Sequence, residues 1–247
     1  MTKATAEQQQ KLLQLQQLDN KLTQITHRRA NLPVDKELTE VSAEATEVNS
    51  AHVIAQTAVS DLERAGRKAE IDVDQVADRI ARNEKLLESG TLGPKESQGI
   101  SGELDSLRIR HSELEDAQLE LMEQLDGARE ALVSADAAAT EVQAKLDGLN
   151  ERRDQELAEL ADQEQEVVNE RAALAAELPA DLLNIYERLR KSLGGVAVAK
   201  LERGVSGGSG FVLSPAEVSA VKALPADAIA YCEESGVILV RGADAWA

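Results

Sequence analysis

The sequence is short of aromatic residues. Its 247 residues include only four aromatic side chains, at Tyr186, Phe211, Tyr231 and Trp246. Aromatic side chains usually supply much of the apolar area that a globular core buries, so the segment before position 186 is not expected to form a globular domain. That segment is rich in Ala, Glu, Gln, Leu and Arg, a composition typical of long helices.

Cysteine and long apolar runs are also scarce. The single cysteine, Cys232, excludes an intramolecular disulfide and fits a reducing compartment. No apolar run has the length of a signal peptide core or of a membrane span. These absences predict a cytoplasmic protein that does not contact a membrane.

The chain is strongly acidic, with a formal net charge of -18. From Pro179 to the end there are eight acidic and seven basic residues, so almost all of the negative charge belongs to residues 1–178. So acidic a segment repels nucleic acid and anionic lipid. Any contact with nucleic acid is therefore expected in the C-terminal quarter.

Apolar residues recur at alternating steps of three and four along two long segments. The first series spans residues 38–87 and the second spans residues 100–149, with a weaker continuation to Leu174. This spacing is typical of the seam of a coiled coil. His52 and His111 fall on seam positions, and we interpret them as tolerated polar residues that do not meet in a binding site.

A short link joins the two series. Gly90 is suited to end one helix and Pro94 to begin the next. Two long helices with so short a link are expected to be antiparallel neighbours. The sequence thus predicts an antiparallel coiled-coil hairpin over residues 1–178, with its tip near residues 90–95 and a kink or brief interruption near Pro33.

The pattern changes after position 178. Residues 181–191 predict an amphipathic helix, and residues 214–217 form a capping box that opens a helix to about position 224. Short apolar segments at 196–201, 211–213, 228–231 and 237–241 predict strands. The chain is therefore expected to be mainly α, with a small α+β domain at residues 179–247.

Several motifs resemble those of a bacterial family that joins a long helical hairpin to a C-terminal zinc ribbon with four cysteines. The resemblance rests on Val205–Gly210 and Tyr231–Arg241, which are similar to the two knuckles of the ribbon. Gly93–Glu96 and Ser112–Asp116 are similar to the hairpin tip and the start of the second arm, and Ser214–Glu217 also matches.

The resemblance places the metal ligands at Ser206, Ser209, Cys232 and Ser235. A structural zinc ion needs four ligands of thiolate or imidazole type, and a serine hydroxyl is a poor substitute. We therefore predict a ribbon-like domain that lacks zinc and needs no cofactor. Its fold would be held instead by a small apolar core of Tyr186, Phe211, Leu213, Val237, Ile238 and Leu239.

No arrangement of residues predicts catalysis. Cys232 has no histidine in its own domain, and the glycine-rich segment 207–210 lacks the lysine of a phosphate-binding loop. We expect a non-enzymatic scaffold or adaptor that binds a protein partner through the coiled coil, the ribbon-like domain, or both. The resemblance implies a role in transcription-related regulation, because some members are similar to proteins that bind the sigma factor sigma-54.

Two alternatives remain open. The C-terminal domain carries a basic cluster that would suit nucleic acid, at Arg188, Arg190, Lys191, Lys200 and Arg203. These side chains are also explained by a helix end that balances its dipole and faces an acidic hairpin. The other alternative is self-association of the hairpin as a dimer or filament.

Overall fold

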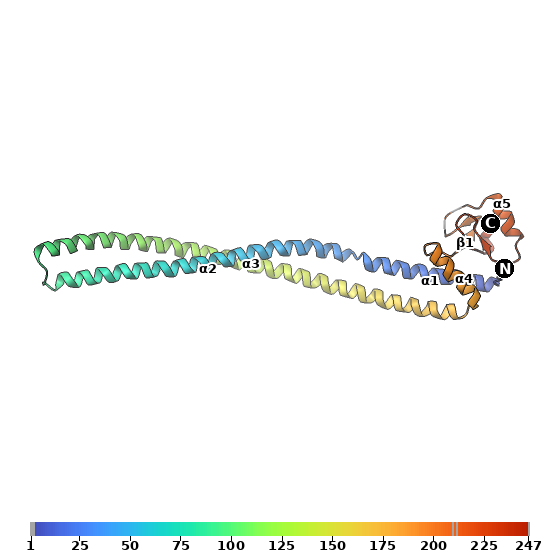
Figure 1. Cartoon of the computed structure of the whole chain (residues 1–247), viewed down its shortest axis with the longest axis horizontal. Coiled ribbons are helices and arrows are strands. Elements are labelled where there is room, and N and C mark those ends of the chain that lie inside the picture. Colours follow the sequence, from blue (N-terminus) through green and yellow to red (C-terminus); the bar gives the residue numbers. More distant parts are fainter. Residues whose placement is uncertain (1–2, 209, 211, 247) are drawn as a thin grey trace. The chain divides into compact units, whose positions relative to one another are not determined.

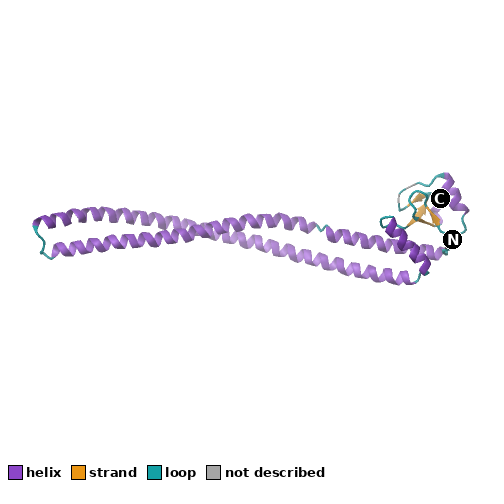
Figure 2. Cartoon of the chain, in the orientation of Figure 1, coloured by secondary structure: helices purple, strands orange, loops and turns teal. Residues whose placement is uncertain are grey.

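The computed structural model describes residues 3–208, 210 and 212–246. Three long helices make up most of the chain: α1 (Ala6–Ala30), α2 (Pro33–Glu88) and α3 (Pro94–Ala176) (Figure 1). Within the described ranges, strands occur only in the C-terminal part (Figure 2). The predicted fold class is confirmed: a long coiled-coil helical hairpin is followed by a small domain that contains strands.

The chain divides into two compact units. One consists of Met1–Asp35 and Arg152–Ala247, and the other consists of Lys36–Glu151. The unit that holds the C-terminal elements thus also holds α1 and the last part of α3, whereas the sequence places a domain boundary after residue 178. We call Lys36–Glu151 the arm and the other unit the base.

The arm is an antiparallel pair of helices. Three ion pairs join the two helices: Glu84–Arg108, Glu63–Arg129 and Glu44–Lys145. The residue numbers increase along α3 as those of their partners decrease along α2, as in an antiparallel pair. The residues of both predicted apolar series are less exposed than most of their neighbours, and Ala45, Leu104 and Val142 are buried, which confirms the seam. At the tip, Gly90 has a φ of 67°, a left-handed conformation that ends α2.

Pro33 begins a new helix. Helix α1 ends at Ala30 and α2 starts with Pro33, a position where the missing N–H of proline leaves no hydrogen bond unmade. The flanking side chains of Leu32 and Val34 are buried. The proline therefore separates two helices rather than bending a continuous one.

The base contains the remaining elements. These are α4 (Ala180–Ser192), β1 (Val198–Glu202), β2 (Val205–Ser206), α5 (Pro215–Ala223), β3 (Ala230–Tyr231), β4 (Ile238–Arg241) and the 3-10 helix η1 (Ala243–Trp246). The strands form one sheet in the order β2-β1-β4-β3, in which β1 and β4 are parallel and the other pairs are antiparallel.

The prediction of a strand at residues 211–213 is wrong. Val212 makes only an isolated bridge to Val205, and Phe211 lies outside the described residues. Strand β2 was not predicted, because two residues are too few to show an alternating pattern.

Both faces of the sheet are covered, as expected when two central strands are parallel. Neighbouring residues of β4 alternate between the two faces, so that Ile238 and Val240 join one apolar cluster and Leu239 joins the other. The first cluster includes Leu12 and Leu15 of α1. The N-terminal helix therefore completes the core of the C-terminal fold.

Candidate functional site

The predicted basic cluster does not form one continuous patch of free charge. Arg190 forms an ion pair with Asp19, and Lys200 is bonded to Glu202 and lies near Asp244. Arg188 and Lys191 are exposed on α4. Arg203 is exposed in the turn after β1, where its φ is 51°.

The strongest polar network of the base surrounds Asp19 of α1. The Asp19 side chain is 1% exposed and accepts hydrogen bonds from Arg171 Nε (2.7 Å) and Tyr186 Oη (2.6 Å). Arg190 of α4 adds an ion pair at 3.2 Å, and Arg171 Nη2, which also donates to Asp19, donates to Glu187. A buried carboxylate needs such partners, since leaving it unpaired costs several kcal/mol. The network joins α1, α3 and α4.

Two pKa values reflect this network. Burial and the hydrogen bond to Asp19 raise the pKa of Tyr186. The hydrogen bond to Asp19 raises the pKa of Arg171. Both groups are therefore held in their protonated forms. The arrangement is suited to hold the helices together, because each of its donor residues is paired with a carboxylate of the same network.

Two charged residues at or beside seam positions indicate this network in the sequence. Arg171 occupies a seam position between Val167 and Leu174, where an apolar residue is expected. Asp19 follows the seam residue Leu18 on the opposite helix. An arginine and an aspartate at facing levels of two antiparallel helices predict a pair, once the register is known.

Two buried carboxamides attach α1 to the rest of the base. Gln16 Oε1 accepts hydrogen bonds from the backbone N–H groups of Ala197 (2.7 Å) and Val198 (3.3 Å), and its Nε2 donates to the Gly195 carbonyl. Gln9 Nε2 donates to the carbonyl of Ala226 at 3.1 Å. These amides satisfy backbone groups at the start of β1 and in the loop after α5.

Two turns in the base have the same geometry. The carbonyl of Ser206 accepts from the N–H of Gly210 at 2.8 Å, and the carbonyl of Cys232 accepts from the N–H of Gly236 at 2.9 Å. Both glycines are left-handed, with φ values of 70° and 72°. These are the turns in which the resemblance places the metal ligands.

The side chains of these turns do not fit a zinc ion. The hydroxyl oxygens of Ser206 and Ser235 are buried and have no hydrogen-bond partner among the residues that the structure describes, and Cys232 is a buried thiol. Ser209 lies outside the described residues. A single thiolate with protonated hydroxyls lacks the donor set of a tetrahedral zinc site. Within the described residues, no group of three or more His, Cys, Asp and Glu is placed to hold a metal.

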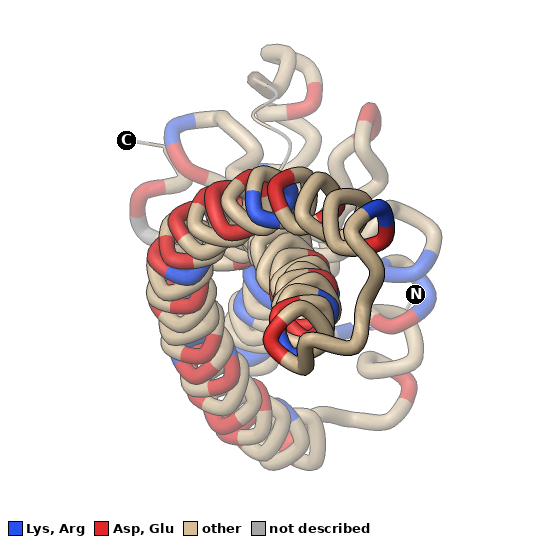
Figure 3. The backbone as a smooth tube through the Cα atoms, turned by 90° about the vertical axis from the view of Figure 1, so that its left-hand side faces the viewer, with Lys and Arg blue, Asp and Glu red and all other residues tan. Residues whose placement is uncertain are grey.

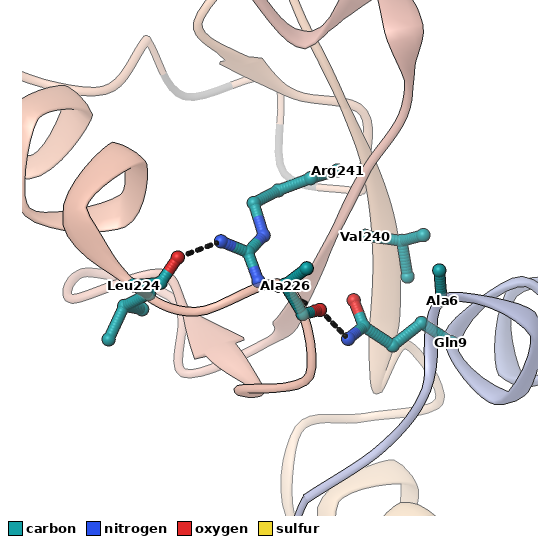
Figure 4. Close-up of a pocket in the computed structure, with 6 residues that line it drawn as sticks. All are labelled: Ala6, Gln9, Leu224, Ala226, Val240 and Arg241. Carbon is teal, nitrogen blue, oxygen red and sulfur yellow. Dashed lines mark hydrogen bonds between the residues drawn. The ribbon is translucent and has the colours of Figure 1, made fainter.

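A loop follows α5, at residues 224–229. The guanidinium of Arg241 donates to five carbonyls in and before this loop, including those of Leu224 (3.0 Å), Pro225 (2.7 Å) and Ala228 (2.9 Å). Figure 4 shows Arg241 and Gln9 reaching the loop from different elements.

Two clefts open beside this loop. One has a volume of about 250 Å³, and the residues of Figure 4 line it. The other has a volume of about 360 Å³ and is more apolar, with Leu224, Pro225, Ile229 and Tyr231 in its wall. The exposed ion pair Lys3–Asp227 also lines it.

The acidic charge is concentrated in the arm. Residues 36–151 contain 26 acidic and 12 basic residues, a net of -14 out of the -18 of the whole chain. Acidic residues, which are red on the backbone tube of Figure 3, occur along both of its helices. None of the helices that the structure describes combines the length and apolar character required to span a bilayer.

Comparison with known sequences identifies relatives over nearly the whole chain. The profile of a family described as the CT398-like coiled coil hairpin domain matches residues 15–194. The Mycobacterium tuberculosis protein Rv2229c is 31% identical over 239 residues, which cover 97% of each chain. The Mycobacterium leprae protein ML1638 is 27% identical and covers 91% of this chain and 96% of the relative.

Solved structures share the fold. A Mycobacterium smegmatis protein superposes with a TM-score of 0.87 at 29% identity, covering 98% of this chain and all of the other. CT398 from Chlamydia trachomatis superposes with a TM-score of 0.66 at 19% identity, covering 96% of this chain and 98% of that protein. At that identity the likeness to CT398 concerns the fold alone.

Proposed function

Because the chain belongs to the CT398-like coiled coil hairpin domain family, we propose that it is a non-enzymatic scaffold or adaptor that binds a protein partner. The observation that carries the proposal is the surface of the arm. Its helices leave large apolar side chains in solvent, where the side chains of a partner would bury them. They are Val53, Ile54, Ile71, Ile109, Leu119, Met122 and Val133, each more than half exposed.

The placement of the reactive side chains supports a role without catalysis. His52 pairs with Asp136, and His111 pairs with Glu115 on its own helix. Cys232 is buried in the second apolar cluster of the base, and that cluster contains no histidine. No nucleophile and base therefore come together at a cleft among these residues.

We also propose that the C-terminal elements are a ribbon-like domain that folds without zinc. The two equivalent turns with left-handed glycines support this, as do the serines at the ligand positions. The apolar cluster around Leu201 and Leu239 stabilises the domain in place of a metal. Elemental analysis of purified protein should find no stoichiometric zinc, and a chelator should leave its melting temperature unchanged; either a bound equivalent or a large shift would refute the idea.

The partner hypothesis is tested by shortening the arm in register. Removal of residues 64–84 and 108–128 deletes the same number of whole heptads from each helix and retains both the tip and the base. Affinity purification from the native host should recover a protein with the full-length chain and lose it with the shortened chain. Recovery of the same protein by the shortened chain would show that this part of the arm is not the binding surface.

Nucleic-acid binding by the base is the competing hypothesis. It is favoured by the exposed side chains of Arg188 and Lys191 on α4. Binding of RNA or DNA with a steep dependence on salt, abolished in the Arg188→Gln/Lys191→Gln variant, would support it over the adaptor.

A further inference from the structure

One face of α3 in the arm carries a dense row of acidic residues. Residues 113–130 contain seven acidic side chains and one arginine. Five of the acids recur at steps that keep them on one side of a helix. They are Glu113, Asp116, Glu120, Glu123 and Glu130, and we call them the acidic face.

Much of this charge has no internal counterion. Among the residues that the structure describes, Asp116, Glu123 and Glu130 form no ion pair, although Glu113 pairs with Arg110. Like charges one turn apart destabilise a helix. The acidic face thus keeps an unfavourable self-interaction that a cationic partner would relieve.

Two large apolar side chains lie beside this row. Leu119 is 59% exposed and Met122 is 55% exposed, and they are three residues apart on the same helix. Methionine adapts its shape readily and is common on surfaces that bind helices. An exposed apolar pair three residues apart provides the i and i+3 anchors that a partner helix contacts.

Met122 also lines a groove between α3 and α2. The groove has a volume of about 460 Å³, and its apolar wall consists of Gly66, Met122 and Leu125. Its charged lining is balanced, with two glutamates and two arginines: Glu63, Glu70, Arg67 and Arg129. Gly66 occupies a seam position where other layers have a side chain, and there is open space around it. The missing side chain therefore leaves room for an apolar residue of another molecule.

We propose that the acidic face, with Leu119, Met122 and the Gly66 groove, docks a basic amphipathic helix of a partner protein. Such a helix would place apolar residues on Leu119 and Met122 and its Lys and Arg side chains beside the acids. Charge complementarity selects this occupant, because nucleic acid, anionic lipid and a second copy of this face are all repelled by it. This inference rests on the proposed function and specifies the surface and the partner's chemistry.

The probe is a synthetic peptide of Leu and Lys that forms an amphipathic helix, compared with a scrambled peptide of equal composition. The full-length chain should bind the amphipathic peptide at least about tenfold more tightly than the scrambled one. Equal binding of the two peptides would overturn the proposal, since it would show attraction to charge alone.

Two variants and a matched control locate the binding site. Leu119→Ser/Met122→Ser and Asp116→Lys/Glu123→Lys should each weaken binding at least about tenfold. Glu40→Lys/Glu47→Lys makes the same charge change elsewhere on the arm and should leave binding within about twofold. All these side chains are exposed, so helicity and melting temperature should match those of the parent protein. An equal loss in the control would overturn the proposal.

The same variants separate this inference from the adaptor hypothesis. If the native partner is lost with the shortened arm and retained by Asp116→Lys/Glu123→Lys, the adaptor function stands and the acidic face is refuted. If the partner is lost in both, and the Glu40→Lys/Glu47→Lys control retains it, the acidic face is the docking surface.

Discussion

Arg171 of α3 donates two hydrogen bonds to the carboxylate of Asp19 on α1, although 152 positions separate the two residues in the chain. Tyr186 of α4 donates a third hydrogen bond to the same carboxylate. One buried charge thereby fixes the register of α1 against α3 and attaches the helix that leads into the sheet.

Replacing Asp19 with alanine should destabilise the base by about 3 kcal/mol, because it removes the shared partner of two arginines in a buried setting. The free energy of unfolding can be measured by urea denaturation with the fluorescence of Trp246, the only tryptophan. Asp61→Ala removes a carboxylate that forms an exposed pair with Arg64, and it should have little effect.

The double variant Asp19→Leu/Arg171→Leu distinguishes a cost of the unpaired charge from a loss of packing. Apolar replacement of both residues should recover part of the stability that Asp19→Ala loses, although Arg190 and the Tyr186 hydroxyl still lack their acceptor. A double variant as unstable as the single one would show that the network contributes more than the pairing of its charges.

Tyr186 should resist ionisation in the folded protein. Its pKa is raised by burial and by Asp19, whereas an unfolded tyrosine ionises near about pH 10. The stabilising contribution is therefore fully present below about pH 10 and is lost as the pH rises toward the folded pKa. In a Tyr231→Phe background, phenolate absorbance should appear only together with unfolding. Phenolate formation before the loss of helicity would contradict the buried network.

Gly208 should not tolerate a side chain. A β-carbon there would lie 2.8 Å from Cβ of Ala199 and 3.1 Å from Val196 Cγ1, and relieving that overlap should cost about 1–3 kcal/mol. Ala199→Gly should partly rescue Gly208→Ala. Gly210→Ala is the control: it strains a backbone with φ of 70°, costs about 1 kcal/mol, and should not be rescued by Ala199→Gly.

Ser206→Ala should stabilise the base by about 1 kcal/mol, because it removes a buried hydroxyl that has no partner. Thermal unfolding with and without a chelator checks both the gain and its independence of metal. Ser219→Ala, at an exposed hydroxyl bonded to the Pro215 carbonyl, should leave the melting temperature nearly unchanged. A destabilised Ser206→Ala protein would mean that this hydroxyl has a ligand.

Arg241→Lys should loosen the loop after α5. Lysine keeps the charge but lacks the planar fork that reaches five carbonyls. Hydrogen exchange at residues 224–229 should accelerate, while exchange in the arm stays the same. Arg203→Lys, at an exposed turn, is the matched control and should change neither.

The arm could be predicted residue by residue because a coiled coil repeats. In every turn of the helix one side chain faces the seam and the others face solvent, and this pattern repeats many times from Leu38 to Leu87. Polar residues in the series, such as His52, do not shift its steps of three and four. A periodic element therefore needs no knowledge of distant contacts.

The base could be predicted only in part. Its helices have caps and its strands have apolar runs, but the parallel pairing of β1 with β4 and the strand order do not appear in any local pattern. Gln9 and Gln16 look like ordinary polar helix residues, and only the fold shows that they satisfy backbone groups of the sheet. Long-range partners decide these roles.

The apolar cluster shared by Leu12, Leu15 and Ile238 has a consequence for synthesis on the ribosome. Helix α1 is made first, yet the strand that it covers is made almost last. During most of translation the apolar side of α1 lacks these contacts or is bound by a chaperone. The core of the base is complete only when β4 has emerged. Premature termination before β4 would therefore leave α1 without the side chains of Ile238 and Val240, which complete the apolar cluster around Leu12 and Leu15.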